Sequence, residues 1–140
     1  MSTFVLNCSV TLAWLFQDEA GPDTDQLLKE LRDDDRNAIV PNLWRLELGN
    51  TLTQAERRGR ITAAQLATAL ELVRGLPITT DAETDNRAFR EILNLARTTS
   101  LTTYDASYLE LAMRHGVPLA TLDKALIRAA RGVAVKTLPA

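Results

Sequence analysis

Four side chains in this sequence could carry chemistry: Asn7, Glu47, Asp105 and Asp123. Asn7 and Asp123 each follow a short apolar run, whereas Glu47 and Asp105 lie in the first turns of predicted helices. Because the strands of a parallel sheet end at one edge, all four side chains can meet there. Carboxylates gathered without cationic partners repel one another, and a hard ion such as Mg²⁺ or Mn²⁺ relieves that repulsion. The four residues therefore predict a metal site that activates water for hydrolysis.

Each of the four residues also has a structural interpretation. Asp105 could complement a helix N-terminus, and Asp123 could cap the helix that follows it. Glu47 could be a solvated helix residue, and Asn7 could be a turn former. We favour the functional interpretation because all four can reach one edge of one sheet, with few basic residues in the same motifs to neutralise them.

Other catalytic arrangements have weaker support. The only histidine, His115, lies in the last turn of a predicted helix, where a favourable interaction with the helix C-terminus is expected. Without another histidine, neither a Ser-His-Asp nor a Cys-His arrangement has a convincing base. The single cysteine, Cys8, has no partner for zinc or for a disulfide, so we expect it to pack as a small hydrophobic side chain.

The elements that position these residues follow from short apolar runs that alternate with helical periodicity. Strands are predicted at 4–6, 38–41, 75–80, 117–122 and 133–138. Helices are predicted at 10–16, 22–34, 43–58, 61–74, 83–97, 104–115 and 124–131, with Ser9 or Thr11 capping the first and Thr62 the fourth. This alternation indicates a parallel sheet covered on both faces. A chain of 140 residues is expected to form one α/β domain, residues 1–140.

Charge and composition narrow the classes of function. The net charge of −2 gives no overall attraction to nucleic acid, so RNA binding would need local basic clusters. Two clusters are present, Arg57, Arg58 and Arg60 after the third predicted helix, and Lys124, Arg128 and Arg131 along the last. Both are also explained as solvated helix faces. The sequence shows no leader-like start and no long apolar run, which favours a cytoplasmic protein without membrane attachment.

At these residues the sequence resembles the PIN-domain ribonucleases, and among them the VapC toxins of toxin–antitoxin pairs. The resemblance rests on "FVLNCSVTLAWLFQDE", "VPNLWRLELGNTL", "LTTYDASYLELAMRHGVPLATLD" and "VAVKTL", in this order. It implies a three-layer α/β domain with a short parallel sheet of about five strands. It also implies an endoribonuclease that depends on Mg²⁺ or Mn²⁺ and cleaves RNA phosphodiesters. The implied partners are RNA, a second copy in a homodimer, and an antitoxin whose C-terminal tail enters the acidic groove.

The resemblance assigns roles to individual positions. Glu47, Asp105, Asp123 and the position held by Asn7 would form the catalytic and metal-binding set. The family places a hydroxyl two residues after the first of these positions and two residues before the last. Ser9 and Thr121 match those hydroxyls and would support the site.

Asn7 departs from the family pattern, in which this position is ordinarily Asp. An amide removes one negative charge beside the metal while keeping the shape of the side chain, so we expect an impaired or inactive enzyme in a well-folded scaffold. A deliberate substitution that makes a toxin tolerable and a naturally weakened homologue both explain Asn7. A non-catalytic PIN module that docks RNA or an antitoxin is the alternative function. A phosphate-accepting receiver-like domain ranks lower, because no acid ends the first strand.

Overall fold

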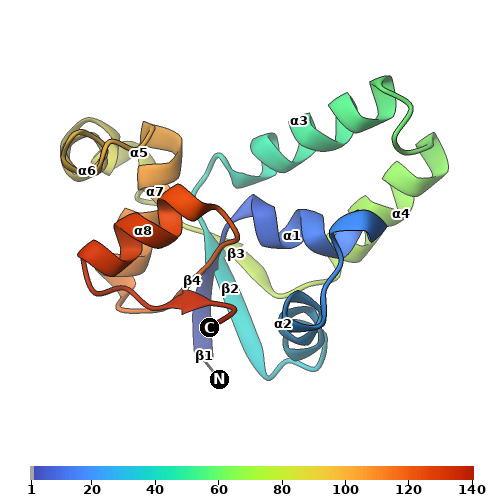
Figure 1. Ribbon diagram of the computed structural model, residues 1–140, viewed down its shortest axis with the longest axis horizontal. Helices are drawn as coiled ribbons and strands as arrows, with labels where there is room; N and C mark the ends of the chain where they lie inside the picture. The colour runs from blue at the N-terminus through green and yellow to red at the C-terminus, as the bar shows by residue number, and fades with distance from the viewer. Residues whose placement is uncertain (1) are drawn as a thin grey trace.

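A five-stranded sheet forms the centre of the computed structural model, which describes residues 2–140. The strand order is β3-β2-β1-β4-β5 (Figure 1). The strands are β1 (Ser2–Leu6), β2 (Arg36–Val40), β3 (Ile78–Thr80), β4 (Leu119–Ala120) and β5 (Thr137–Leu138). Every neighbouring pair is parallel, which confirms the predicted sheet. The strands therefore share one carboxyl edge, with β1 in the middle.

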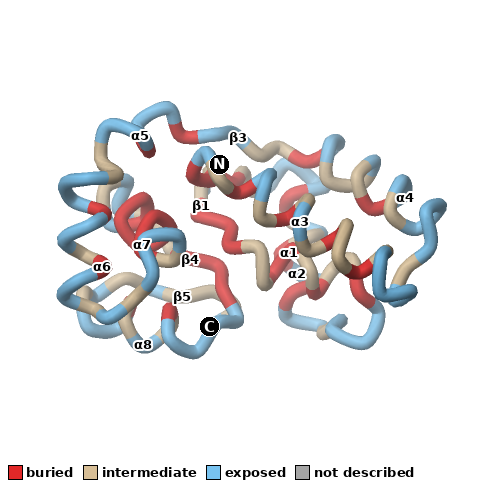
Figure 2. The backbone as a smooth tube through the Cα atoms, turned by 90° about the horizontal axis from the view of Figure 1, so that it is seen from above, coloured by how far each residue is buried: buried red, intermediate tan, exposed pale blue. Residues whose placement is uncertain are grey.

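Helices on both sides of this sheet complete a three-layer domain (Figures 1 and 2). One side holds α1 (Cys8–Leu15), η1 (Gln17–Glu19), α2 (Pro22–Arg32), α3 (Trp44–Arg57) and α4 (Ala63–Arg74). The other side holds α5 (Thr84–Arg87), the π-helical η2 (Ala88–Ile92), α6 (Leu93–Thr99), α7 (Thr103–His115) and α8 (Lys124–Gly132). Within residues 2–140, none of these helices combines the length and the apolar character that crossing a membrane requires.

The core lies where the two helical layers meet the sheet. Phe4, Val5 and Leu6 of β1 are fully buried, as expected for the central strand of a parallel sheet covered on both faces. Trp44 at the start of α3 and Tyr108 in α7 are the two largest fully buried side chains. Figure 2 shows buried segments along β1, β4 and α7, with shorter buried patches on the surrounding helices. The core thus brings the start of α3 and the middle of α7 beside the end of β1.

The first helix differs from the prediction at its start. It was predicted at residues 10–16 with Ser9 or Thr11 as the cap, but α1 begins at Cys8 and Asn7 is its N-cap. The Asn7 side chain accepts a hydrogen bond from the backbone N–H of Ser9 at 3.2 Å. An acceptor oxygen in the cap position satisfies a helical N–H that would otherwise lack a partner, so the helix starts two residues earlier. The predicted cap at Thr62 is confirmed and forms a full capping box with Gln65.

The helix predicted at 83–97 is not continuous. The structure divides this segment into α5, the π turn η2 and α6, which ends at Thr99. Thr84 and Ile92 are both buried. A straight α-helix would rotate residue 92 by about 80° from residue 84, and the wider π turn removes most of that rotation. The irregular turn therefore keeps both side chains on the buried face.

Candidate active site

Asn7 sits at the carboxyl end of β1 in a frame of hydroxyl groups. Its Oδ1 accepts hydrogen bonds from Ser9 Oγ at 2.6 Å and from Thr121 Oγ1 at 3.1 Å, in addition to the one from the Ser9 backbone. Ser9 Oγ in turn accepts from the backbone N–H of Leu122 at 2.9 Å, and Thr121 Oγ1 accepts from that of Asp123 at 3.1 Å. The two predicted supporting hydroxyls thus tie the end of β1 to the loop after β4.

This frame fixes the orientation of the Asn7 amide. The backbone N–H of Ser9 can only donate, so the atom facing it must be the carbonyl oxygen and not the NH₂ group. The Oδ1 atom is then occupied by three donors, and the Nδ2 atom takes no part in these bonds. An amide oxygen in this state has no lone pair left for a cation, and an NH₂ group cannot bind one.

The three predicted acids come from three different elements. Glu47 lies in the first turn of α3, Asp105 in the first turn of α7, and Asp123 at the start of α8. Burial raises the pKa of Glu47, and the charge of Asp105 raises it further. Burial likewise raises the pKa of Asp105, and the charge of Asp123 adds to that. The charge of Asp123 therefore acts on Asp105 and the charge of Asp105 acts on Glu47, and we call these three acids the acidic row.

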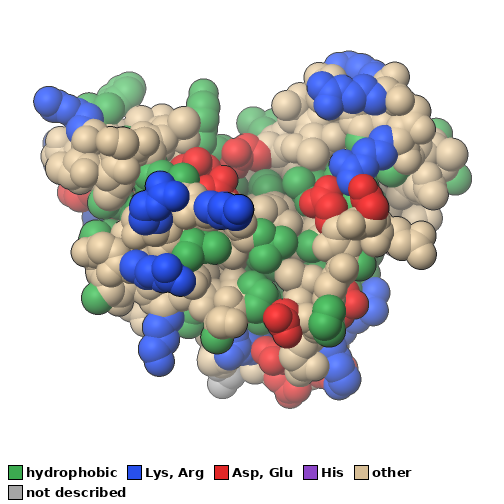
Figure 3. Space-filling model, viewed as in Figure 1, with side chains coloured by type: hydrophobic (Ala, Val, Ile, Leu, Met, Phe, Trp, Pro, Cys, Tyr) green, Lys and Arg blue, Asp and Glu red, His purple; other side chains and the backbone are tan. Residues whose placement is uncertain are grey.

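No cationic side chain neutralises this row. Within residues 2–140, none of the ion pairs includes Glu47, Asp105 or Asp123. Figure 3 shows acidic side chains in a hollow between the part formed by α3 and the part formed by α7 and α8. Asp123 also has the structural role predicted for it, because its carboxylate caps α8 by accepting from the backbone N–H of Leu126 at 3.0 Å. Asp105 lies in the first turn of α7, where an acid complements the helix N-terminus as the structural interpretation predicted, and Thr102 is the N-cap.

The chemistry of the row fits a hydrated divalent cation. In the described chain, no three His, Cys, Asp or Glu side chains converge tightly enough to form a preformed metal centre. Mg²⁺ does not need one, because it commonly binds through one or two carboxylates and keeps several water molecules. Glu47, Asp105 and Asp123 supply such oxygens, and the repulsion among them favours a cation. Asn7 does not fit as a ligand in its present orientation.

Tyr108 is a site residue that the sequence analysis did not single out. Its side chain is fully buried and its hydroxyl donates to Glu47 Oε1. The same hydroxyl lies 3.7 Å from Cys8 Sγ, which also donates to the carbonyl oxygen of Trp44 at 3.6 Å. Burial raises the pKa of the Cys8 thiol to about 12, so the thiol stays protonated. The signal was available, because a buried tyrosine hydroxyl needs a partner and Tyr108 lies one helical turn after Asp105.

A second unpredicted cluster anchors α7 to the sheet. Arg114 binds Asp81 at 2.7 Å and Glu110 at 3.0 Å, and both carboxylates are almost fully buried. Burial acts to raise the pKa of Asp81, but the hydrogen bond and charge of Arg114 outweigh it and lower that pKa. Asp81 follows β3, whereas α7 carries Asp105 and Tyr108. The cluster therefore holds the helix that supplies two residues of the site.

The two predicted basic clusters differ in their surroundings. Arg60 is bound to Asp18 at 2.8 Å and to Glu19 at 2.9 Å, with its guanidinium 3.9 Å from the centre of the Phe16 ring. Its charge is therefore already neutralised. On α8, Lys124, Arg128 and Arg131 form no ion pair within the described residues. Figure 3 shows basic side chains over this part of the molecule, next to the acidic hollow.

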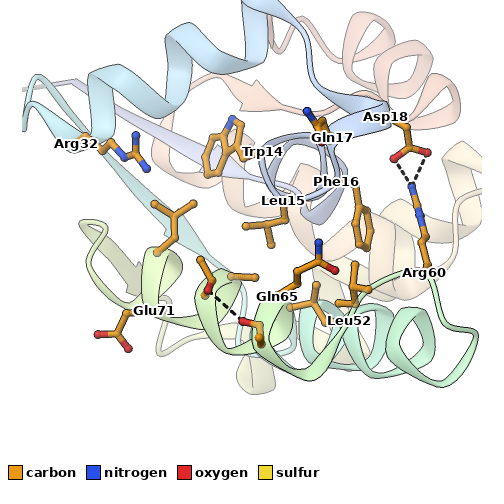
Figure 4. A pocket seen from close by; sticks show the side chains of 15 residues that line it. Trp14, Leu15, Phe16, Gln17, Asp18, Arg32, Leu52, Arg60, Gln65 and Glu71 are labelled. Carbon is orange, nitrogen blue, oxygen red and sulfur yellow. Dashed lines mark hydrogen bonds and ion pairs between the residues drawn. The ribbon is translucent and has the colours of Figure 1, made fainter.

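A large cavity lies elsewhere, between α1, η1 and α4 (Figure 4). Its volume is about 1120 Å³, and its walls are mainly apolar, with Trp14, Leu15, Phe16 and Leu52 among them. The Arg60 to Asp18 ion pair closes one end (Figure 4). None of the four predicted site residues lines it. The cavity is therefore separate from the acidic row.

A comparison with models of protein families gives a match that covers most of the chain. The sequence matches the model of the PIN domain over residues 5–132. The chain is a PIN domain. Among proteins with curated functions, none matches the sequence significantly.

Solved structures share the PIN fold along nearly the whole chain. PAE2754 from Pyrobaculum aerophilum has 24% sequence identity and a TM-score of 0.70, covering 99% of this chain and 92% of that one. VapBC2 from Rickettsia felis, bound to a DNA fragment from their promoter, has 13% identity and a TM-score of 0.68, covering 98% and 97%. FitAcB from Neisseria gonorrhoeae has 16% identity and a TM-score of 0.60, covering 98% and 96%. At these identities the likeness establishes the fold.

Proposed function

We propose that this PIN domain is a VapC-like toxin whose site cleaves RNA with Mg²⁺ or Mn²⁺, and that Asn7 holds it in a weakly active form. The observation that carries the proposal is the row of Glu47, Asp105 and Asp123, three carboxylates from separate elements that form no ion pair within residues 2–140. Burying acids next to one another lowers stability unless a ligand compensates. A divalent cation would compensate the repulsion among these acids. The phosphate of RNA is the anion that such a cation would bind.

The residues of the chain would divide the work. Glu47, Asp105 and Asp123 would hold the cation directly or through water, and Tyr108 would keep Glu47 in place through its hydroxyl. When bound, the cation would supply charge neutralisation at the phosphate and lower the pKa of water for in-line attack. Lys124, Arg128 and Arg131 lie on α8, which Asp123 caps, and would contact the neighbouring phosphates. Arg57 and Arg58 would extend this contact along the end of α3.

Asn7 would weaken the site in two ways. It removes a negative charge, and the Ser9 backbone fixes its amide so that the oxygen is used within the frame. With Asp at this position, one oxygen would keep the three hydrogen bonds, and the other, standing where Nδ2 is now, would be free to bind a cation. We therefore expect Asn7→Asp to restore the metal site without changing the fold.

The family also suggests partners. We propose an antitoxin as the protein partner, in line with the VapBC2 and FitAcB structures that share the fold, and a homodimer as the assembly. The apolar cavity between α1 and α4 would hold part of the antitoxin, since its walls are mainly apolar and contain none of the predicted site residues.

The decisive experiment compares this chain with its Asn7→Asp variant on a broad RNA panel, with Mg²⁺, with Mn²⁺ and with a chelator. We expect cleavage that needs metal and is much stronger in the variant, and calorimetry with Mn²⁺ should show tighter binding to the variant. Asp105→Ala in the Asn7→Asp background should abolish cleavage while the melting temperature stays close to that of its parent.

The alternative is a PIN module that binds RNA or an antitoxin without cutting. The three hydrogen bonds that occupy Asn7 Oδ1 favour it, because they leave the site short of a ligand. Absence of cleavage by both forms, together with retained RNA binding, would replace the nuclease proposal with this alternative.

A further inference from the structure

The first turn of α3, which carries Glu47, has no side-chain cap of its own. Its N-cap is Leu43, and leucine offers no acceptor for the free N–H groups of a first turn. α3 packs mainly against α1 and α4, and neither of these helices carries another acid of the row. Figure 1 shows α3 running from the carboxyl edge of the sheet away from α7 and α8. Helix packing alone therefore does not set where Glu47 lies relative to Asp105.

Arg45 ties this turn to the edge of the sheet. Its Nη1 atom donates to Thr80 Oγ1 at 2.5 Å, and its Nη2 atom donates to the backbone carbonyl of Ile78 at 3.4 Å. Both acceptors belong to β3, an edge strand, which has carbonyl groups that no further strand pairs. The guanidinium also lies 5.6 Å from the ring centre of Trp44, whose side chain is fully buried. The planar fork of an arginine can serve two acceptors and a ring together.

Asn42 adds a second tie just before the helix. Its backbone N–H donates to Thr84 Oγ1 at 3.2 Å, and its Nδ2 atom donates to Asp85 Oδ1 at 2.8 Å. Thr84 Oγ1 in turn donates to Asp81 Oδ2 at 3.4 Å, and Arg114 of α7 binds the same carboxylate. The segment from β3 to α5 therefore connects the start of α3 to α7, the helix that supplies two residues of the site.

Arg45 and Glu47 hold the first turn of α3 from opposite sides. Residues two apart in an α-helix point about 200° apart around its axis. Arg45 contacts β3, whereas Glu47 reaches α7, where the hydroxyl of Tyr108 donates to its Oε1 atom. If the tie to β3 were lost, the turn could tilt, and the Glu47 carboxylate would move with it. Displacements of about 1 Å are enough to impair a catalytic arrangement.

We propose that Arg45 is a positioning residue for Glu47: by holding the first turn of α3 against β3, it keeps the Glu47 carboxylate on Tyr108 and within the acidic row. Asn42 supports the same turn. The proposal rests on the proposed function where it concerns the cation, because Glu47 would be one of the cation ligands. The hydrogen bond between Tyr108 and Glu47 does not involve a cation, so the positioning can also be measured in the metal-free chain.

The metal-free test is a double-mutant cycle between Arg45→Met and Tyr108→Phe. Methionine keeps an apolar chain beside the Trp44 ring and removes both donors. Urea denaturation at pH near 8 would compare the parent, the two single variants and the double variant. The effect of Tyr108→Phe on the equilibrium constant of unfolding should be about fivefold smaller in Arg45→Met than in the parent. Effects that multiply to within about twofold would overturn the proposal.

The second test measures Mn²⁺ binding by calorimetry in the Asn7→Asp background. Arg45→Met should weaken binding by about tenfold, as for loss of a group that orients a metal ligand. Arg45→Lys keeps the charge, but an ammonium cannot replace the planar fork, so it should restore little of this loss. Arg97→Met removes an exposed arginine on α6 and should leave binding unchanged. Melting curves would show that all variants are folded.

The two tests separate this proposal from the nuclease. If Asn7→Asp binds no Mn²⁺ or cuts no RNA while the cycle shows the coupling, the positioning of Glu47 stands and the proposed function fails. If Asn7→Asp binds Mn²⁺ and cuts RNA while Arg45→Met causes no loss of affinity, the positioning proposal fails and the nuclease stands. If Arg45→Lys binds Mn²⁺ like the parent, charge alone explains the effect and the proposal is wrong. An equal loss with Arg97→Met would overturn it as well.

Discussion

Tyr108→Phe tests the part of the site that the structure defines most closely. The variant keeps the buried ring and removes only the hydroxyl that donates to Glu47 Oε1. That hydrogen bond lowers the pKa of Glu47 and opposes the effect of burial, so its loss should raise this pKa further. A carboxyl group whose pKa is higher in the folded state than in the unfolded state binds more protons when the protein is folded. Its contribution to stability therefore falls as the pH rises from the unfolded-state pKa to the folded-state pKa.

The size of the effect should depend on the charge of Glu47. A hydrogen bond to a charged acceptor contributes about 1.5–3 kcal/mol, and one between neutral groups about 0.5–1.5 kcal/mol. Glu47 is only half-buried, so water can replace part of the lost bond, and we place the loss near the middle of each range. The free energy of unfolding should fall by about 2 kcal/mol at pH near 8 and by about 1 kcal/mol at pH near 4, where Glu47 is protonated.

Urea denaturation of the metal-free protein at both pH values would measure these losses. Tyr104→Phe is the matched control, because it removes the hydroxyl of an exposed tyrosine and should change stability by less than about 0.5 kcal/mol. A loss of the same size at both pH values, or no loss at either, would refute the view that Tyr108 holds a charged Glu47.

Two further changes probe the supports of the site. Arg114→Met should lower the free energy of unfolding by about 3 kcal/mol, because it leaves the buried carboxylates of Asp81 and Glu110 without their partner. Lys29→Ala, which removes an exposed ion pair, should lower it by less than about 0.5 kcal/mol. Chemical denaturation measures both losses, and equal losses would contradict the effect expected from burial. Asn7→Ala should destabilise the protein by about 1 kcal/mol because it removes the N-cap of α1, whereas Asn7→Asp keeps a capping oxygen and should not. Melting temperatures measure the difference, and equal values for the two variants would show that the cap contributes nothing.

The sequence predicted most of the fold because its apolar runs are local signals. The central strand is uninterrupted at Phe4 to Leu6, and the capping box at Thr62 marks a helix start without reference to the rest of the chain. The interrupted helix at 83–97 could not be foreseen in the same way. Its π turn depends on which of its side chains can be buried against neighbouring elements such as α7. That is decided by the packing of the whole structure and not by the local sequence.

The candidate site was predictable only in part for a similar reason. The sequence gives the identities of Glu47, Asp105 and Asp123, and parallel strands give them a common edge. It does not give partners, since Tyr108 meets Glu47 across 61 residues and Arg114 meets Asp81 across 33. The cap formed by Asn7 was missed because Ser9 and Thr11 are equally good cap residues by type.

Position 7 serves the fold through one side-chain oxygen and lies at the proposed metal site. The hydroxyl frame and the start of α1 need only one oxygen from this side chain, and both Asn and Asp provide it. Codons for aspartate and asparagine differ by one base, so under the proposed function a single mutational step would change the charge at position 7 while the hydrogen bonds of the hydroxyl frame stay in place.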